Sequence, residues 1–125
     1  MSVSRAIVPT IAIVDDDPDV RGSIDSLLRS AMMNPRCFAS AEEMLAAGIE
    51  DDLACIVTDL HMPGMTGLEL QAEAGRRGWS VPIIIMTAYP TEIVRGQAEK
   101  AGAVAFLPKA VDPEGLLDAS ERGVR

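Results

Sequence analysis

Short apolar runs that alternate with longer amphipathic segments are the feature of this chain that most constrains its fold. Four runs are clear, at 11–14, 55–58, 83–86 and 104–107, and a shorter one lies around 36–38. Runs of this length are typical of buried strands, and their alternation with helical segments indicates βαβ units and a parallel sheet. A chain of 125 residues is long enough for one such domain and too short for two. We therefore predict one doubly wound α/β domain with five strands and five helices.

Residues that favour helix N-termini follow the predicted strands. They are Asp17-Pro18, Ser40, Thr66, Thr91 and Asp112-Pro113. Their side chains accept hydrogen bonds from the unpaired amides of a first turn, and proline suits the first helical position. The spacing of a capping box occurs twice, in Ser40-Ala41-Glu42-Glu43 and in Thr66-Gly67-Leu68-Glu69. The predicted helix stops are Gly78 and Gly102.

Polar side chains follow the predicted strands where each strand ends. Asp15 and Asp16 come after the first run, Asp59 after 55–58, Thr87 after 83–86, and Lys109 shortly after 104–107. The carboxyl ends of parallel strands meet at one edge of a sheet, where ligands bind. Carboxylate oxygens are the ligands that Mg²⁺ prefers in proteins. These residues therefore predict a site for a divalent cation and a phosphoryl group, while Asp17 is assigned to helix capping.

This set of side chains also suits phosphoryl transfer. A carboxylate such as that of Asp59 can attack a phosphoryl group and form an acyl phosphate. Charge that develops on the phosphoryl oxygens is stabilised by a cation, an ammonium group and hydroxyl donors. Taken singly, Thr87 would be a strand terminus and Lys109 a surface lysine, so the interpretation depends on their joint placement.

Bulk properties exclude several classes of function. The net charge of −8 argues against binding to nucleic acid, which requires clustered Lys and Arg, and against docking on anionic lipid. The sequence has no signal-peptide pattern and no apolar run near the ~20 residues that span a membrane. Cys37 and Cys55 are both expected to be buried hydrophobic residues of a reducing compartment, although a disulfide is possible in principle. The predicted location is cytoplasmic.

Four stretches together give the chain a family resemblance. They are Ile13-Val14-Asp15-Asp16-Asp17-Pro18, the segment from Val57 to Glu69 (VTDLHMPGMTGLE), Thr87-Ala88, and Ala101-Gly102-Ala103 continuing through Phe106-Leu107-Pro108-Lys109. The chain resembles the receiver domain of a two-component response regulator, most closely the FixJ-type branch. The resemblance runs from about Thr10 to Arg122. It implies a receiver domain over 10–122, a short tail over 1–9 and no output domain in this chain.

The resemblance implies a flavodoxin-like sheet of strand order 2-1-3-4-5 and a phosphorylation-controlled switch. Asp59 would accept a phosphoryl group from a sensor histidine kinase or a phosphotransfer protein. Asp15 and Asp16, with Asp59 and the backbone carbonyl of His61, would hold Mg²⁺, with Mn²⁺ as an alternative ion. Such a domain catalyses its own phosphorylation and dephosphorylation, and it is not a turnover enzyme on external substrates.

The remaining site residues are also assigned by resemblance. Lys109 would contact the phosphoryl group, and Thr87 would bond one of its oxygens. Phe106 corresponds to an aromatic switch that turns inward when that threonine moves. The face formed by the fourth helix, the fifth strand and the fifth helix, around Ile93, Val94 and Phe106, would then bind a partner or form a homodimer.

Three departures from the family pattern affect the site. Ala110 follows Lys109 where the family usually has proline, and we predict a trans peptide bond there. Thr66 replaces the usual Asp and remains a good N-cap. Tyr89-Pro90 is bulkier than the usual residues after Thr87-Ala88, and Tyr89 could either cover the phosphoryl site or lie on the next helix. With Ala88 and Tyr89, His61 is expected to form a rim that modulates hydrolysis.

Three other functions are alternatives to the phosphorylation switch. An Asp-dependent phosphatase typically has a second acid two residues after its nucleophile, where this chain has His61. A nucleotide-binding protein would carry GxGxxG or a P-loop GKS/GKT, and neither occurs. A degenerate receiver, unphosphorylated and used as a protein-interaction module, is the main alternative. The switch would control transcription through a DNA-binding domain outside this chain. Alternatively, the chain would act as a stand-alone receiver.

Overall fold

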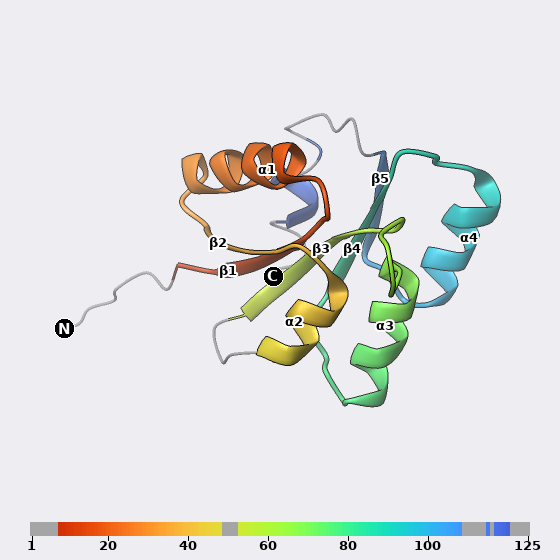
Figure 1. Cartoon of the computed structure of the whole chain (residues 1–125). Coiled ribbons are helices and arrows are strands. Elements are labelled where there is room, and N and C mark those ends of the chain that lie inside the picture. The colour runs from red at the N-terminus through yellow and green to blue at the C-terminus, as the bar shows by residue number, and fades with distance from the viewer. Residues whose placement is uncertain (1–7, 49–52, 109–114, 116, 121–125) are drawn as a thin grey trace.

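Five parallel strands form the centre of the molecule in this computed structural model, which describes residues 8–48, 53–108, 115 and 117–120. The strands lie in the order β2-β1-β3-β4-β5 (Figure 1). Their bounds are Thr10–Val14 for β1, Asn34–Phe38 for β2, Leu53–Asp59 for β3, Ile83–Thr87 for β4 and Ala105–Pro108 for β5. This order confirms the predicted flavodoxin-like topology.

Helices cover both faces of the sheet. Their bounds are Pro18–Ser30 for α1, Ala41–Ala47 for α2, Gly67–Arg76 for α3 and Glu92–Lys100 for α4, and residues 115 and 117–120 are also helical. In Figure 1, α1 and the helical residues near the C-terminus lie on one side of the sheet, and α2, α3 and α4 lie on the other. The predicted doubly wound arrangement is therefore correct. Within the described part of the chain, no helix is long and apolar enough to cross a membrane.

The core is divided in two by the alternation of side chains along each strand. Ile11 and Ile13 of β1 pack with Ile24 and Leu28 of α1 and with Ala119. The intervening residues of β1, Ala12 and Val14, pack on the other face with side chains of α2, α3 and α4. Successive strand residues point to opposite faces, so a strand covered by helices on both sides is apolar throughout. This burial explains why the sequence shows continuous apolar runs.

Four of the predicted helix starts are confirmed by their hydrogen bonds. The side chains of Asp17, Ser40, Thr66 and Thr91 each accept a bond from a backbone amide of the first turn. The capping box at Thr66 and Glu69 is complete. At the other candidate box, Glu43 accepts from the amide of Ala39 rather than from that of Ser40, so only the Ser40 half forms. The predicted start at Asp112 lies outside the described residues.

Two sequence predictions are wrong at the edges of the sheet. Cys37 is exposed, not buried, because β2 is an edge strand and is covered less completely than the central strands. Its thiol donates to Oδ2 of Asp25 at 3.4 Å. Val104 does not belong to the last strand and is 47% exposed. In β5, which is the other edge strand, only Phe106 is buried. Cys55 is buried as predicted.

The two cysteines should therefore differ in reactivity. Burial raises the pKa of the Cys55 thiol to about 12. The pKa of Cys37 is raised by partial burial and by its bond to the Asp25 carboxylate. Because the thiolate is the reacting species, alkylation of Cys37 should accelerate as pH rises and should be faster in Asp25→Asn than in wild type.

We expect native protein at pH 8 to gain one iodoacetamide adduct, at Cys37, and protein in urea to gain two. Peptide mapping by mass spectrometry identifies the modified residue. Equal labelling of both cysteines in the native protein would contradict this account.

Candidate functional site

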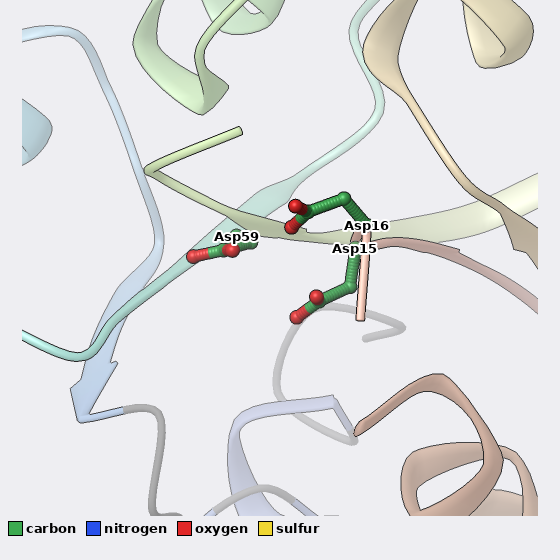
Figure 2. A group of neighbouring side chains, drawn as sticks. All are labelled: Asp15, Asp16 and Asp59. Carbon is green, nitrogen blue, oxygen red and sulfur yellow. The ribbon is translucent and has the colours of Figure 1, made fainter. Parts of the chain in front are cut away.

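Three carboxylates meet at the carboxyl ends of two neighbouring strands. One oxygen each of Asp15, Asp16 and Asp59 lies within 4.8 Å of the other two, and Figure 2 shows the three side chains gathered at this edge of the sheet. Strands β1 and β3 are paired so that Val14 is opposite Thr58. The residues that follow this pair therefore emerge side by side, as the sequence analysis predicts. Asp15 and Asp59 are buried, whereas Asp16 is exposed.

Local hydrogen bonds hold this cluster in place. Oδ1 of Asp15 accepts from the amide of Asp17 at 2.8 Å, and Oδ1 of Asp59 accepts from the amide of His61 at 3.3 Å. The guanidinium of Arg21, on α1, donates to the backbone carbonyl of Asp15 at 2.6 Å. The sequence patterns did not predict this role of Arg21, which lies one turn into α1 and six positions after Asp15. The two amide bonds orient the buried carboxylates, and the Arg21 bond joins the backbone at Asp15 to α1.

The donor set of this cluster fits a hard divalent cation. Three carboxylates at such short range repel one another, and the repulsion is stronger where side chains are buried away from water. A cation bound between them would offset it. Oxygen ligands suit Mg²⁺, which usually takes one or two protein carboxylates and keeps water or phosphate oxygens for its other positions. The exposed position of Asp16 leaves one side of the cluster open to solvent.

Thr87 lies at the same edge of the sheet. It is the last residue of β4 and is fully buried, and β4 pairs with β3 so that Met86 is opposite Asp59. Its Oγ1 accepts from the amide of Tyr89 at 3.0 Å. A hydroxyl has one hydrogen to donate and two lone pairs, so this bond leaves the hydroxyl hydrogen for another acceptor. The structure thus brings Thr87 to the predicted rim, and Ala88 follows it in an exposed position.

His61 and Tyr89 form an aromatic pair at this rim. Their ring centroids lie 5.7 Å apart with an interplanar angle of 73°, an edge-to-face arrangement. Both side chains are exposed, Tyr89 by 69%. The sequence analysis did not foresee this contact. His61 lies two positions after Asp59, the end of β3, and Tyr89 lies two positions after Thr87, the end of β4. Because β3 and β4 are neighbours, the contact could have been predicted from the topology.

Phe106 is turned toward the core. It is 8% exposed and packs in the cluster between the sheet and α2, α3 and α4. The guanidinium carbon of Arg95, on α4, lies 5.1 Å from the centroid of its ring. Ile93, by contrast, is 76% exposed. Lys109 and its peptide bond to Ala110 lie outside the described residues.

The loop between β3 and α3 is held by residues that the sequence analysis did not single out. Oε2 of Glu42, on α2, accepts from the amide of Met65 at 3.0 Å. Gly64 has a φ of +78°, a conformation that favours glycine. Gly67 lies against the backbone of Asp59, so that an added Cβ would be 2.5 Å from the Asp59 carbonyl oxygen. This close approach brings the start of α3 against the end of β3.

Comparisons with known proteins agree with this fold. Residues 11–121 match the sequence model of the family described as response regulator receiver domain. The transcriptional regulatory protein TdiR of Thauera aromatica is 40% identical over 110 residues, which cover 88% of this chain and 48% of TdiR. The transcriptional regulatory protein FixJ of Azorhizobium caulinodans is 38% identical over 109 residues, which cover 87% of this chain and 52% of FixJ. The chain thus spans about half the length of these relatives.

A solved structure gives the same result. The structure of FixJ-N superposes with a TM-score of 0.84 at 33% identity and covers 93% of each chain. The fold and the acidic edge define a receiver domain of a two-component system. The chain belongs to the response regulator receiver domain family, with FixJ-like transcriptional regulators among its relatives. The members of this class are signalling proteins rather than metabolic enzymes.

The contact between Gly67 and Asp59 can be tested by substitution. Gly67→Ala should lower the free energy of unfolding by about 1–3 kcal/mol, because the added methyl group overlaps the Asp59 carbonyl and forces the backbone apart. Gly75→Ala in the same helix has no atom within 4 Å of the added Cβ. It should raise stability by about 0.4–1 kcal/mol. Urea denaturation followed by circular dichroism measures the stability of both variants. Equal denaturation midpoints for Gly67→Ala and Gly75→Ala would contradict the close approach of Gly67 to Asp59.

Proposed function

We propose that this domain is a phosphorylation-controlled switch whose acceptor is Asp59. The observation that carries the proposal is the meeting of the Asp15, Asp16 and Asp59 carboxylates at adjacent strand ends, with oxygens within 4.8 Å. The buried hydroxyl of Thr87 at the end of the next strand supports it. The phosphoryl donor would be a phosphohistidine of a sensor histidine kinase or of a phosphotransfer protein.

Asp15, Asp16 and Asp59, with the carbonyl of His61, would hold Mg²⁺ or Mn²⁺. The bound ion would neutralise charge on the phosphoryl oxygens. A carboxylate oxygen of Asp59 attacks phosphorus, an O–P bond forms, and the N–P bond of the donor breaks with its electron pair returning to the imidazole. The hydroxyl hydrogen of Thr87 and the ammonium group of Lys109 then bond phosphoryl oxygens. In dephosphorylation, water attacks phosphorus, the O–P bond to Asp59 breaks with its electron pair returning to the carboxylate, and inorganic phosphate leaves.

The change at Asp59 would reach the surface through Thr87 and Phe106. If the Thr87 hydroxyl moves toward the phosphoryl group, its hydrogen bond with the Tyr89 amide would break. The segment after β4 would then be able to move. Phe106, which packs in the core cluster on this face and lies under the Arg95 guanidinium of α4, is the residue through which α4 and β5 would respond. The face around Ile93, Val94 and Phe106 would then bind a partner or a second copy of the domain. The exposed Ile93 supports the choice of this face.

Residues 10–122 would form the receiver domain, and residues 1–9 a tail. The relatives are named as transcriptional regulators and are about twice as long as this chain. We therefore propose that the switch acts in control of transcription, through a DNA-binding domain elsewhere, with a stand-alone receiver as the other possibility. The rim residues His61, Ala88 and Tyr89 would set the rate at which water reaches the acyl phosphate. The domain would act in the cytoplasm, without contacting nucleic acid or membrane itself.

A degenerate receiver that binds partners without being phosphorylated is the second candidate. The observation in its favour is in the sequence, where Ala110 replaces the proline that usually follows the lysine of this family. The two candidates make opposite predictions about phosphorylation.

Acetyl phosphate with Mg²⁺ should add one phosphoryl group to the protein, measured as intact mass. The gain should be absent in EDTA and absent from Asp59→Asn, because the variant lacks the attacking carboxylate. Asp19→Asn is the matched control, since Asp19 is exposed on α1 outside the cluster, and it should behave as wild type.

A gain that persists in Asp59→Asn would refute the assignment of the acceptor. No gain in a protein that is folded by circular dichroism would favour the interaction module.

A further inference from the structure

A groove of about 300 Å³ lies at the opposite end of β4 from Thr87. It is formed by the end of α3, the segment that leads into β4, and the turn between α4 and β5. Its lining includes Gln71, Gly75, Trp79, Val81, Pro82 and Val104. None of the acidic-cluster residues lines it. Its volume is at the lower end of the range for small-molecule sites.

One of the residues that line this groove, Gln71, has a side-chain amide oxygen without a partner among the described residues. Gln71 is 8% exposed, and its Oε1 is buried with no hydrogen bond within the described part of the chain. Buried polar atoms in folded proteins are nearly always paired, and an unpaired one costs free energy. The terminal torsion of a Gln side chain is broad, so a small rotation can present this oxygen to a donor in the groove. The wall thus offers an acceptor that no other described residue bonds.

The rest of the lining restricts the kind of ligand that fits. None of the lining residues is charged, so a charged ligand would lose its hydration without compensation. Trp79, Val81 and Pro82 form apolar walls suited to a ring. Trp79 is held in place by Arg77, whose guanidinium carbon lies 5.7 Å from the indole centroid. Arg77 is fixed in turn by bonds to Glu73 at 3.0 Å and to the carbonyl of Leu45 at 3.1 Å.

We propose that this groove binds a small, neutral aromatic molecule that carries an N–H donor, with the ring against Trp79 and the donor bonded to Oε1 of Gln71. The site is separate from Asp59, so it goes beyond the phosphorylation switch, and neither proposal depends on the other. The segments that line it also support α4 and β5, so a ligand here would contact the same elements that we propose respond to phosphorylation.

Benzamide is the probe, because it is neutral and aromatic and has amide N–H donors; toluene is its counterpart without a donor. Trp79 is the single tryptophan of the chain, so intrinsic fluorescence reports the groove directly. Added benzamide should change the Trp79 emission, and the change should saturate as the benzamide concentration rises. Gln71→Met removes the acceptor at similar volume and should weaken benzamide binding about fivefold to tenfold, while the affinity for toluene stays within about twofold.

Gly75 supplies the control variants. Gly75 lines the groove, and a Cβ there would have no neighbouring atom within 4 Å, so the longer side chain of Gly75→Leu can be accommodated. This variant should block the groove and abolish the saturable change, whereas Gly75→Ala should retain it. In wild-type protein, benzamide should also shift the nuclear magnetic resonance signals of the Gln71 side-chain amide and the Gly102 backbone amide. This second measurement does not depend on the folding of any variant. A linear emission change without saturation, binding that persists in Gly75→Leu, or unshifted Gln71 and Gly102 signals would each overturn the proposal.

Discussion

The pairing of β1 with β3 is the constraint on which the candidate site depends. Because Val14 is opposite Thr58, Asp15 and Asp59 leave the sheet together, and Asp16 completes a cluster of three carboxylates. A shift of one residue in either strand would turn these side chains to the other face of the sheet. The register of β1 and β3 thus sets the site. The mutual repulsion of the carboxylates costs free energy. The burial of every residue of β1 between the two helical layers is favourable and offsets this cost.

Much of this arrangement could be predicted because it follows from local rules. The apolar runs predicted the strands. The capping residues Asp17, Ser40, Thr66 and Thr91 predicted the starts of four helices. Strand ends in a parallel sheet share one edge, so the meeting of Asp15, Asp16, Asp59 and Thr87 required only the topology. Thr66, where the family usually has Asp, is predicted to cap its helix, and its hydroxyl accepts from the Glu69 amide.

The features that were missed depend on which strands are at the edges and on contacts between distant segments. The apolar run around Cys37 predicts burial, but the strand order 2-1-3-4-5 that the resemblance implies makes this an edge strand, which is covered less completely than a central one, so the exposure of Cys37 could have been predicted. The bond from Met65 to Glu42 joins residues 23 positions apart, and no local pattern predicts it. The approach of Gly67 to Asp59, by contrast, has a physical cause that can be recognised afterwards: only glycine allows α3 to begin against the backbone of β3.

The most direct test of the central claim is to identify the residue that carries the phosphoryl group. An acyl phosphate is reduced by borohydride to an alcohol, which converts a phosphorylated aspartate to homoserine. Protein treated with acetyl phosphate and Mg²⁺, reduced and digested, would be sequenced by tandem mass spectrometry. The account predicts homoserine at position 59 and intact Asp at positions 15 and 16. Homoserine at 15 or 16, or none at position 59 in protein that had gained a phosphoryl group, would contradict it.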